Sequence, residues 1–289
     1  MNQSENNQLN EPPVPQKQIW MLGFFDVLGF SARVKNENID KIYEDYENLI
    51  KRVLSNHEID TTGMIVPTFM GGSLFSAGGK VEINYTYFSD TILLWAPLLP
   101  MYPRLFLQRC TDIMCESLLM KIPLRGAISV GKGYMHKRTG IYLGEHIVDA
   151  ARLESMQEHI GVAMTMSAGQ SILIPASHPT QIIEYYTPIK ENAQYPEIWS
   201  PIALDWPRRW RDRNCGNLIQ HLEQLKPQNE AVSKYYDNAI KFVNWSEQYN
   251  DWHNDPDKGA DFKHLVCKEI TALPKQWTNT RALVRLVRR

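Results

Sequence analysis

The sequence predicts an α+β protein with a mostly antiparallel sheet, and three observations support this class. Short apolar runs typical of strands alternate with segments whose apolar residues recur at helical spacing. Two strand-like runs are separated by only two residues, as in a hairpin. The segments follow the order strand, helix, hairpin, helix, strand, helix and strand. A split βαβ order of this kind predicts a ferredoxin-like arrangement with the helices on one face of the sheet.

The individual elements follow from local patterns. The first strand is predicted at 18–27, where the apolar run QIWMLGFFDV contains Asp26 next to its end. A helix is predicted over 38–57, because its apolar residues repeat at intervals of three and four. The segment 81–97 forms two strand-like halves that turn at Ser89 and Asp90. The remaining predicted elements are a helix at 102–121, a strand at 123–134, a helix at 144–157 and a strand at 162–167.

The chain divides into three predicted parts. Residues 1–17 are rich in Asn, Gln, Glu and Pro, which predicts a disordered leader. They have neither the basic start nor the apolar core of a signal peptide. Residues 18–176 carry the predicted α+β core. Residues 177–289 are predicted to be a C-terminal extension packed on that core, helical over 228–252 and 260–289.

Composition restricts the function classes. The 289 residues include 31 basic and 32 acidic side chains, so no overall charge draws the protein to nucleic acid or to a membrane surface. Every apolar stretch is shorter than the roughly 20 residues that span a bilayer. The four cysteines form no CxxC pair and no metal-binding spacing, which predicts reduced thiols and a cytoplasmic protein.

Two aspartates are candidate metal ligands. Asp26 lies at the end of the first strand and Asp90 at the tip of the hairpin. These elements lie side by side in a split βαβ sheet, so their carboxylates can converge. Two hard oxygen ligands with an adjacent backbone carbonyl suit Mg²⁺ or Mn²⁺ that carries substrate phosphates. The alternative is that Asp26 is a helix N-cap and Asp90 a turn residue. The presence of an aspartate at both positions, on neighbouring elements, favours the metal site.

The residues after Asp26 add a candidate phosphate site. The sequence VLGFS predicts a glycine turn that opens a helix. Backbone N–H groups at such a turn point toward an anion. The stretch FFDVLGFSA therefore predicts a metal ligand followed by a phosphate-binding turn.

Four motifs in order resemble those of the class III nucleotidyl cyclases. FFDVLGFSA resembles their first metal motif, and YFSDTILLW resembles the hairpin with the second metal aspartate. LRGAISVGKGY is similar to their R-x-G-[IL]-x-x-G strand, and GEHIVDAARLES to the helix that supplies transition-state residues. The four motifs occur in the family's order over roughly residues 18–175, so the resemblance is much more specific than a match to any single motif.

The resemblance assigns roles to residues of this chain. Asp26 and Asp90 would hold two Mg²⁺ or Mn²⁺ ions, with the Val27 carbonyl as a further ligand. The amides of Leu28, Gly29, Phe30 and Ser31 would bind the triphosphate. Arg152 would stabilise charge on the transferring α-phosphate. In the family the active site forms between two subunits, so the resemblance implies an obligate homodimer in which Arg152 acts on the partner's metals. The alternative for Arg152 is an exposed helix arginine paired with Glu145 or Glu154.

Three positions depart from the purine-specific members of the family. Val148 stands where the family has its transition-state asparagine. Thr86 occupies the position of the adenine-reading lysine, and Ile141 that of the base-reading aspartate. A purine-reading site is therefore not encoded, and Thr86 is a candidate for contact with a smaller base. Tyr46, Tyr85 and Tyr87 are candidates for stacking on it, in no order of preference.

This loss is typical of the Pycsar pyrimidine cyclases of bacterial anti-phage defence. The helix motif GEHIVDAARLE, the strand motif RGAISVG and the tail segment KYYDNAIKFVNW at 234–245 also resemble theirs. The resemblance implies cyclisation of UTP to 3′,5′-cyclic UMP and pyrophosphate, with the product activating a separate antiviral effector protein. CTP as substrate stays open.

Two other functions stay open from the residues. A diguanylate-cyclase-like or palm-type domain shares the two aspartates, but the AARLE helix is evidence against it. A degenerate cyclase domain that only binds nucleotide is supported by Val148 and opposed by the retention of both aspartates. The arginine cluster PRRWRDR at 207–213 is interpreted as a solvated surface rather than a nucleic-acid site.

Overall fold

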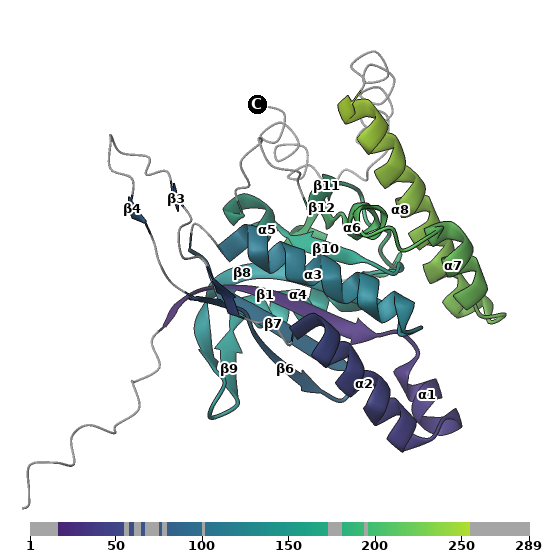
Figure 1. Ribbon diagram of the computed structural model, residues 1–289, viewed down its shortest axis with the longest axis horizontal. Coiled ribbons are helices and arrows are strands. Elements are labelled where there is room, and N and C mark those ends of the chain that lie inside the picture. Colours follow the sequence, from purple (N-terminus) through teal and green to yellow (C-terminus); the bar gives the residue numbers. More distant parts are fainter. Residues whose placement is uncertain are drawn as a thin grey trace, which may run out of the picture.

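The computed structural model describes residues 17–54, 58–60, 65–66, 75–76, 80–99, 102–172, 181–193 and 196–254. The predicted leader, except Lys17, and the predicted helix at 260–289 lie outside these residues. Within them, an eight-stranded sheet forms the centre of the fold (Figure 1). The strands are β1 (Gln18–Val27), β6 (Asn84–Phe88), β7 (Thr91–Pro97), β8 (Leu124–His136), β9 (Ile141–Gly144), β10 (Val162–Thr165), β11 (Ile182–Glu184) and β12 (Trp199–Leu204).

The sheet is mostly antiparallel, as predicted. Its strand order is β11-β12-β10-β8-β1-β7-β6, with β9 paired to β8 off this path. Only the β8–β10 pair is parallel among these described strands. Two small ladders lie apart from this sheet and pair β2 (Glu58–Asp60) with β5 (Lys80–Glu82), and β3 (Ile65–Val66) with β4 (Phe75–Ser76).

The helices complete the predicted element order. They are α1 (Phe30–Asn36), α2 (Ile39–Leu54), α3 (Tyr102–Leu119), α4 (Glu145–Met156), α5 (Met166–Ser171), α6 (Trp206–Asp212), α7 (Leu218–Leu225) and α8 (Glu230–Asn254), with a short 3₁₀ helix at Pro196–Ile198. None of the helices in the described ranges combines the length and the apolar character needed to cross a membrane.

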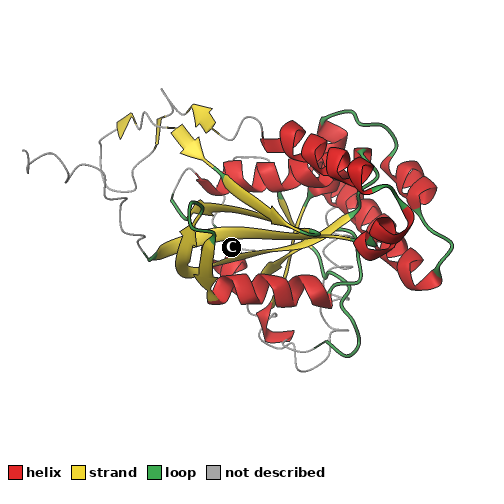
Figure 2. Cartoon of the chain, turned by 90° about the horizontal axis from the view of Figure 1, so that it is seen from below, coloured by secondary structure: helices red, strands yellow, loops and turns green. Residues whose placement is uncertain are grey.

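The prediction that the helices lie on one face is wrong, because helices cover both faces (Figure 2). Strand β1 explains why. Met21 and Phe25 belong to a core shared with α2, α3 and α8, whereas Trp20 and Leu22 belong to a second core with Ala150 and other residues of α4. A central strand that is apolar on both sides requires cover on both sides.

The chain after residue 176 contributes strands as well as helices. The sequence analysis predicted only helices there, but β12 pairs with β10 and is buried at all six positions. Strand β11 pairs with β12 at the edge of the sheet. Phe242 and Ala239 of α8 are fully buried in the same core as Phe106 of α3. The C-terminal segments therefore extend the central sheet and cover one of its faces.

Candidate functional site

Asp26 and Asp90 meet at one end of the sheet. Asp26 lies opposite Thr91 of β7 on one side and Arg125 of β8 on the other. Asp90 occupies the two-residue turn between β6 and β7, where Ser89 has φ 56°. The backbone N–H of Val27 donates to the Asp90 carbonyl at 3.0 Å. The turn is thus fixed against the end of β1, and the structure brings the two predicted carboxylates together.

The two carboxylates influence each other. Burial raises the pKa of Asp26 above its usual value, the Arg125 guanidinium lowers it, and the nearby charge and hydrogen bond of Asp90 raise it again. The Asp26 side chain is 20% exposed. Two like charges in a half-buried position are unfavourable without a cation between them. This charge arrangement fits a divalent ion.

The donor set within one chain is small. Among the residues that the structure describes, no group of three or more His, Cys, Asp and Glu side chains is arranged to hold a metal ion. Asp26 and Asp90 supply two carboxylates, and Mg²⁺ commonly takes only one or two protein carboxylates and completes its shell with substrate phosphates and water. The residues present therefore fit an ion that binds together with a phosphate substrate.

Arg125 and Glu154 form a part of the site that the sequence analysis missed. The Arg125 Nη2 donates to Asp26 Oδ2 at 3.4 Å, and its Nε forms an ion pair with Glu154 Oε1 of α4. The pKa of Glu154 is raised to about 7, because burial raises it more than Arg125 lowers it, and the charge of Asp26 raises it as well. The guanidinium also lies 5.9 Å from the centre of the Tyr235 ring. Arg125 lies in the motif LRGAIS and Glu154 in the motif AARLES. The sequence therefore contained both residues, but it did not indicate that they pair with each other.

Tyr46 of α2 lies close enough to the aspartate pair to be influenced by its charge. Burial raises the pKa of its phenol, and the charges of Asp90 and Asp26 raise it further. The hydroxyl is buried with no hydrogen-bond partner among the described residues. The ring is 8% exposed and packs edge-on against Phe30 at 6.0 Å. A ring buried in this way offers no open face to a base, whereas Tyr87 is 54% exposed.

The predicted glycine turn is present and opens α1. Gly29 has φ 81° and ψ 14°, a left-handed conformation that favours glycine. A Cβ at this position would meet nothing within 4 Å, so the space on the Cβ side of Gly29 is open. The N–H groups of Gly29, Phe30 and Ser31 have no acceptor within the described part of the chain. The Leu28 N–H differs, because it donates to the Pro123 carbonyl at 2.9 Å.

Thr86 and Arg152 lie on other elements. Thr86 is half-buried on the edge strand β6, opposite Leu93 and four residues before Asp90. Arg152 is on α4, with a side chain that is 43% exposed and its Nη1 3.9 Å from Asp149 Oδ1. The sequence left Glu145 or Glu154 as alternative partners of Arg152. The structure instead pairs Glu154 with Arg125.

Comparisons with known proteins give no family assignment. No family model matches the sequence, and no curated protein matches it. Among solved structures the chain is similar to the guanylyl cyclase Cya2, with 9% identity, a TM-score of 0.38, and coverage of 57% of this chain and 89% of that one. It is also similar to the catalytic core of a rhodopsin-guanylyl cyclase with converted specificity in complex with ATPαS, with 15% identity, a TM-score of 0.37, and coverage of 59% and 88%. Similarity at this level assigns neither a family nor an activity to the chain, so a functional conclusion must rest on its own residues.

Proposed function

We propose that the protein is a class III-like nucleotidyl cyclase that converts a pyrimidine nucleoside triphosphate into its 3′,5′-cyclic monophosphate and pyrophosphate. The observation that carries the proposal is the convergence of Asp26 and Asp90 beside the open Gly29 turn. Carboxylates for a cation and free amides for an anion are what a metal-bound triphosphate requires. The order of the four sequence motifs supports the same reading.

Asp26, Asp90 and the Val27 carbonyl would hold two Mg²⁺ or Mn²⁺ ions. When bound, these ions supply charge neutralisation for the phosphates and favour the deprotonated 3′-hydroxyl. Arg125 has a positioning role in this arrangement, since it contacts Asp26 and is itself held by Glu154. The ion pair with Glu154 keeps the guanidinium beside the carboxylate.

The amides of Gly29, Phe30 and Ser31 would bind the triphosphate. The Leu28 amide would join them only by giving up its bond to Pro123. In the reaction, the ribose O3′ forms a bond to the α-phosphorus, and the bond from that phosphorus to the bridging oxygen breaks. Pyrophosphate leaves in line, and the hydroxyl proton passes to solvent. Catalysis of this kind consists mainly of positioning and charge stabilisation.

Arg152 would act on the site of a partner subunit in a homodimer. It is a partly exposed arginine on a helix, and its guanidinium can donate two parallel hydrogen bonds to an α-phosphate. The active sites would then lie at the dimer interface, each combining aspartates from one subunit with Arg152 from the other.

The base would be a pyrimidine, because Thr86 and Ile141 replace the charged purine-reading residues. Thr86 is half-buried and Ile141 is 50% exposed. Neither offers a charge for reading a purine edge. UTP is the favoured substrate and CTP is the alternative, and the cyclic product would activate a separate antiviral effector.

The test is to incubate the purified chain with Mn²⁺ and each of ATP, GTP, CTP and UTP separately. The products would be identified by mass and by chromatographic comparison with 3′,5′-cyclic standards. We expect a cyclic nucleotide and pyrophosphate in equal amounts from UTP or CTP. Exclusive turnover of ATP or GTP would contradict the pyrimidine assignment, and linear products would contradict the cyclase assignment.

One observation favours a second candidate, a degenerate domain that binds nucleotide without turnover. Val148, at the position of the transition-state asparagine, is 46% exposed on α4 and has no hydrogen-bonding group on its side chain. Under this alternative, UTP would bind in the presence of Mn²⁺ in equilibrium dialysis, but no cyclic product would form.

A further inference from the structure

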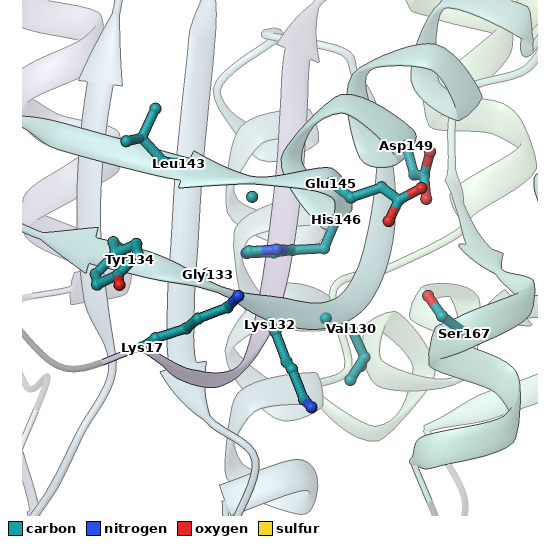
Figure 3. Close-up of a pocket in the computed structure, with 12 residues that line it drawn as sticks. Lys17, Val130, Lys132, Gly133, Tyr134, Leu143, Glu145, His146, Asp149 and Ser167 are labelled. Atoms are coloured by element: carbon teal, nitrogen blue, oxygen red, sulfur yellow. The ribbon is translucent and has the colours of Figure 1, made fainter.

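A pocket of about 600 Å³ lies away from the two aspartates (Figure 3). Strands β8 and β9 form one wall, and the first turns of α4 and α5 form another. Its polar lining consists of Lys17, Lys132, Tyr134, Glu145, Asp149 and Ser167. A volume of this size is within the range of small-molecule binding sites.

The pocket carries charges of both signs on different sides. In Figure 3 the carboxylates of Glu145 and Asp149 lie together, and the amino group of Lys17 points into the space from the opposite side. Within the described ranges, neither Lys17 nor Lys132 nor Glu145 takes part in an ion pair. Asp149 is the exception, since its Oδ1 lies 3.9 Å from Arg152 Nη1. The charges of Lys17, Lys132 and Glu145 can be neutralised by a ligand that bridges them.

The acidic side favours a cationic group. Burial raises the pKa of Asp149, the charges of Glu145 and Glu197 raise it further, and Arg152 lowers it. Of these acidic groups, Glu145 and Asp149 line the pocket, and their carboxylates repel each other. A protonated amine placed among them would relieve that repulsion.

His146 forms a buried wall of the pocket, and three glycines accommodate its ring. A Cβ on Gly131, Gly133 or Gly144 would lie 2.8, 2.6 or 2.4 Å from atoms of the His146 side chain, so only glycine leaves room for the ring. The residue is 2% exposed, and both ring nitrogens are buried without a hydrogen bond of good geometry in the part of the chain described.

The imidazole adds no charge to the pocket. Burial lowers the pKa of His146, and the nearby Lys132 backbone raises it only in part, so the ring is neutral at neutral pH. Buried polar atoms without partners are rare in folded proteins and call for an explanation, such as a bound water or ligand. Because the two nitrogens of His146 have almost no accessible surface, the ring serves as a wall of the pocket and not as a group that contacts the ligand.

We propose that this pocket binds a small zwitterion of the amino-acid or dipeptide class. The ligand's carboxylate lies at Lys17 and Lys132, and its protonated amine lies at Glu145 and Asp149. Tyr134 and the Leu143 side chain provide an apolar wall for its body.

Simpler ligands fit the charges less well. An inorganic anion would be attracted by the lysines but repelled by the carboxylates. A metal cation would be attracted by the carboxylates but repelled by the lysines. The described residues also include no metal-binding group of His, Cys, Asp and Glu side chains at this place. Neither Asp26, Asp90 nor Arg125 lines the pocket, but Asp149 lies 3.9 Å from Arg152, so the two proposed sites share this contact on α4.

The experiment is isothermal titration calorimetry of the full chain with the standard L-amino acids and the dipeptides that glycine forms with each of them. We expect at least one to bind. Its N-acetylated form, which lacks the amine charge, and its amide form, which lacks the carboxylate, should each bind about tenfold more weakly or worse, which corresponds to about 1.4 kcal/mol.

Matched variants locate the site. Lys132→Met and Glu145→Gln should each weaken binding of the same compound by about tenfold or more. Lys241→Met and Glu223→Gln change exposed residues of α8 and α7 and should leave its affinity unchanged. Three results would overturn the proposal: no binding by any member of the panel, equal binding of the acetylated form, or equal binding by the two pocket variants. Circular dichroism of each variant distinguishes loss of the site from loss of the fold.

Discussion

At the scale of single residues, the account depends on Asp26. Its position at the end of a buried strand was evident from the sequence, and so was the place of Asp90 at a hairpin tip. Their convergence could be predicted because both positions follow from local strand and turn patterns. The Arg125–Glu154 ion pair could not, since it joins β8 to α4 and depends on how that helix lies across the sheet.

Asp26→Asn should abolish most turnover without loss of stability. The change removes a metal ligand charge, and we expect product formation to fall roughly 10²- to 10³-fold, the loss typical when one charge-stabilising group leaves an active site. The melting temperature should not fall, because burial and the nearby charge of Asp90 both disfavour the ionised form of Asp26 in the folded protein. Product formation and thermal unfolding are the two measurements. Asp40→Asn, on the exposed surface of α2, is the control, and equal activity of the two variants would rule out the metal assignment.

His159 predicts a specific dependence of stability on pH. The ring is fully buried beside Tyr185 and Phe242, and burial lowers its pKa from 6.5 to about 3. The unfolded chain therefore binds a proton below pH 6.5 that the folded chain does not. This contribution to stability is complete above pH 6.5 and is lost progressively as the pH falls toward 3.

Between pH 7 and pH 5 the loss from His159 alone should be about 2 kcal/mol, because each pH unit below 6.5 costs about 1.4 kcal/mol. Urea unfolding at both pH values measures it. His159→Phe should lose less stability than the wild type over the same interval, by about that amount. Identical losses would show that His159 is protonated in the folded protein or is not buried.

At the scale of elements, the contact between α4 and the β8–β9 hairpin is set by glycine positions. The sequence analysis predicted the helix and most of β8 from their apolar patterns. It did not predict β9, or that three glycines leave space for His146. Local patterns do not reveal such a contact, because His146 is on α4, Gly131 and Gly133 are on β8, and Gly144 ends β9.

Gly133→Ala should therefore destabilise the protein. Its Cβ would lie 2.4 Å from the Leu143 carbonyl oxygen and 2.6 Å from the His146 ring, so backbone as well as side chain must shift. We expect a loss of about 1–3 kcal/mol, the usual range for overpacking, measured by urea unfolding.

Gly169→Ala is the matched control in α5, where the nearest atom to the new Cβ is 3.3 Å away at the end of the Ile202 side chain. It should change stability by less than about 1 kcal/mol. A Gly133→Ala variant as stable as this control would mean that His146 can leave its position without cost.

At the scale of the whole molecule, one sheet with a core on each face positions both parts of the proposed active site. Asp26 lies at the end of β1 and Asp90 in the adjoining β6–β7 turn. Arg152 is on α4, the helix that packs against the sheet face carrying Trp20 and Leu22. The sequence predicted the antiparallel sheet but placed its helices on one face, because a pattern of elements does not state which side of a sheet each helix covers.

Subunit complementation tests whether each active site combines two chains. Asp26→Asn and Arg152→Ala should each be inactive alone. After mixing and exchange of subunits, a heterodimer has one site with both defects and one with neither, so activity should return to about a quarter of the wild-type value in a two-fold symmetric dimer. Sedimentation of the mixture reports the oligomeric state. Two inactive variants that remain inactive after demonstrated exchange would place Arg152 in the same chain's site or outside it.

The most direct test of the central claim is a competition among substrates. Equal concentrations of ATP, GTP, CTP and UTP would be incubated with Mn²⁺ and either wild-type protein or Asp26→Asn, and all cyclic products would be quantified by mass spectrometry. The account predicts that cyclic UMP or cyclic CMP is the main product of the wild type and falls roughly 10²- to 10³-fold with the variant. A purine cyclic nucleotide as the main product, or no cyclic nucleotide from the wild type, would contradict it.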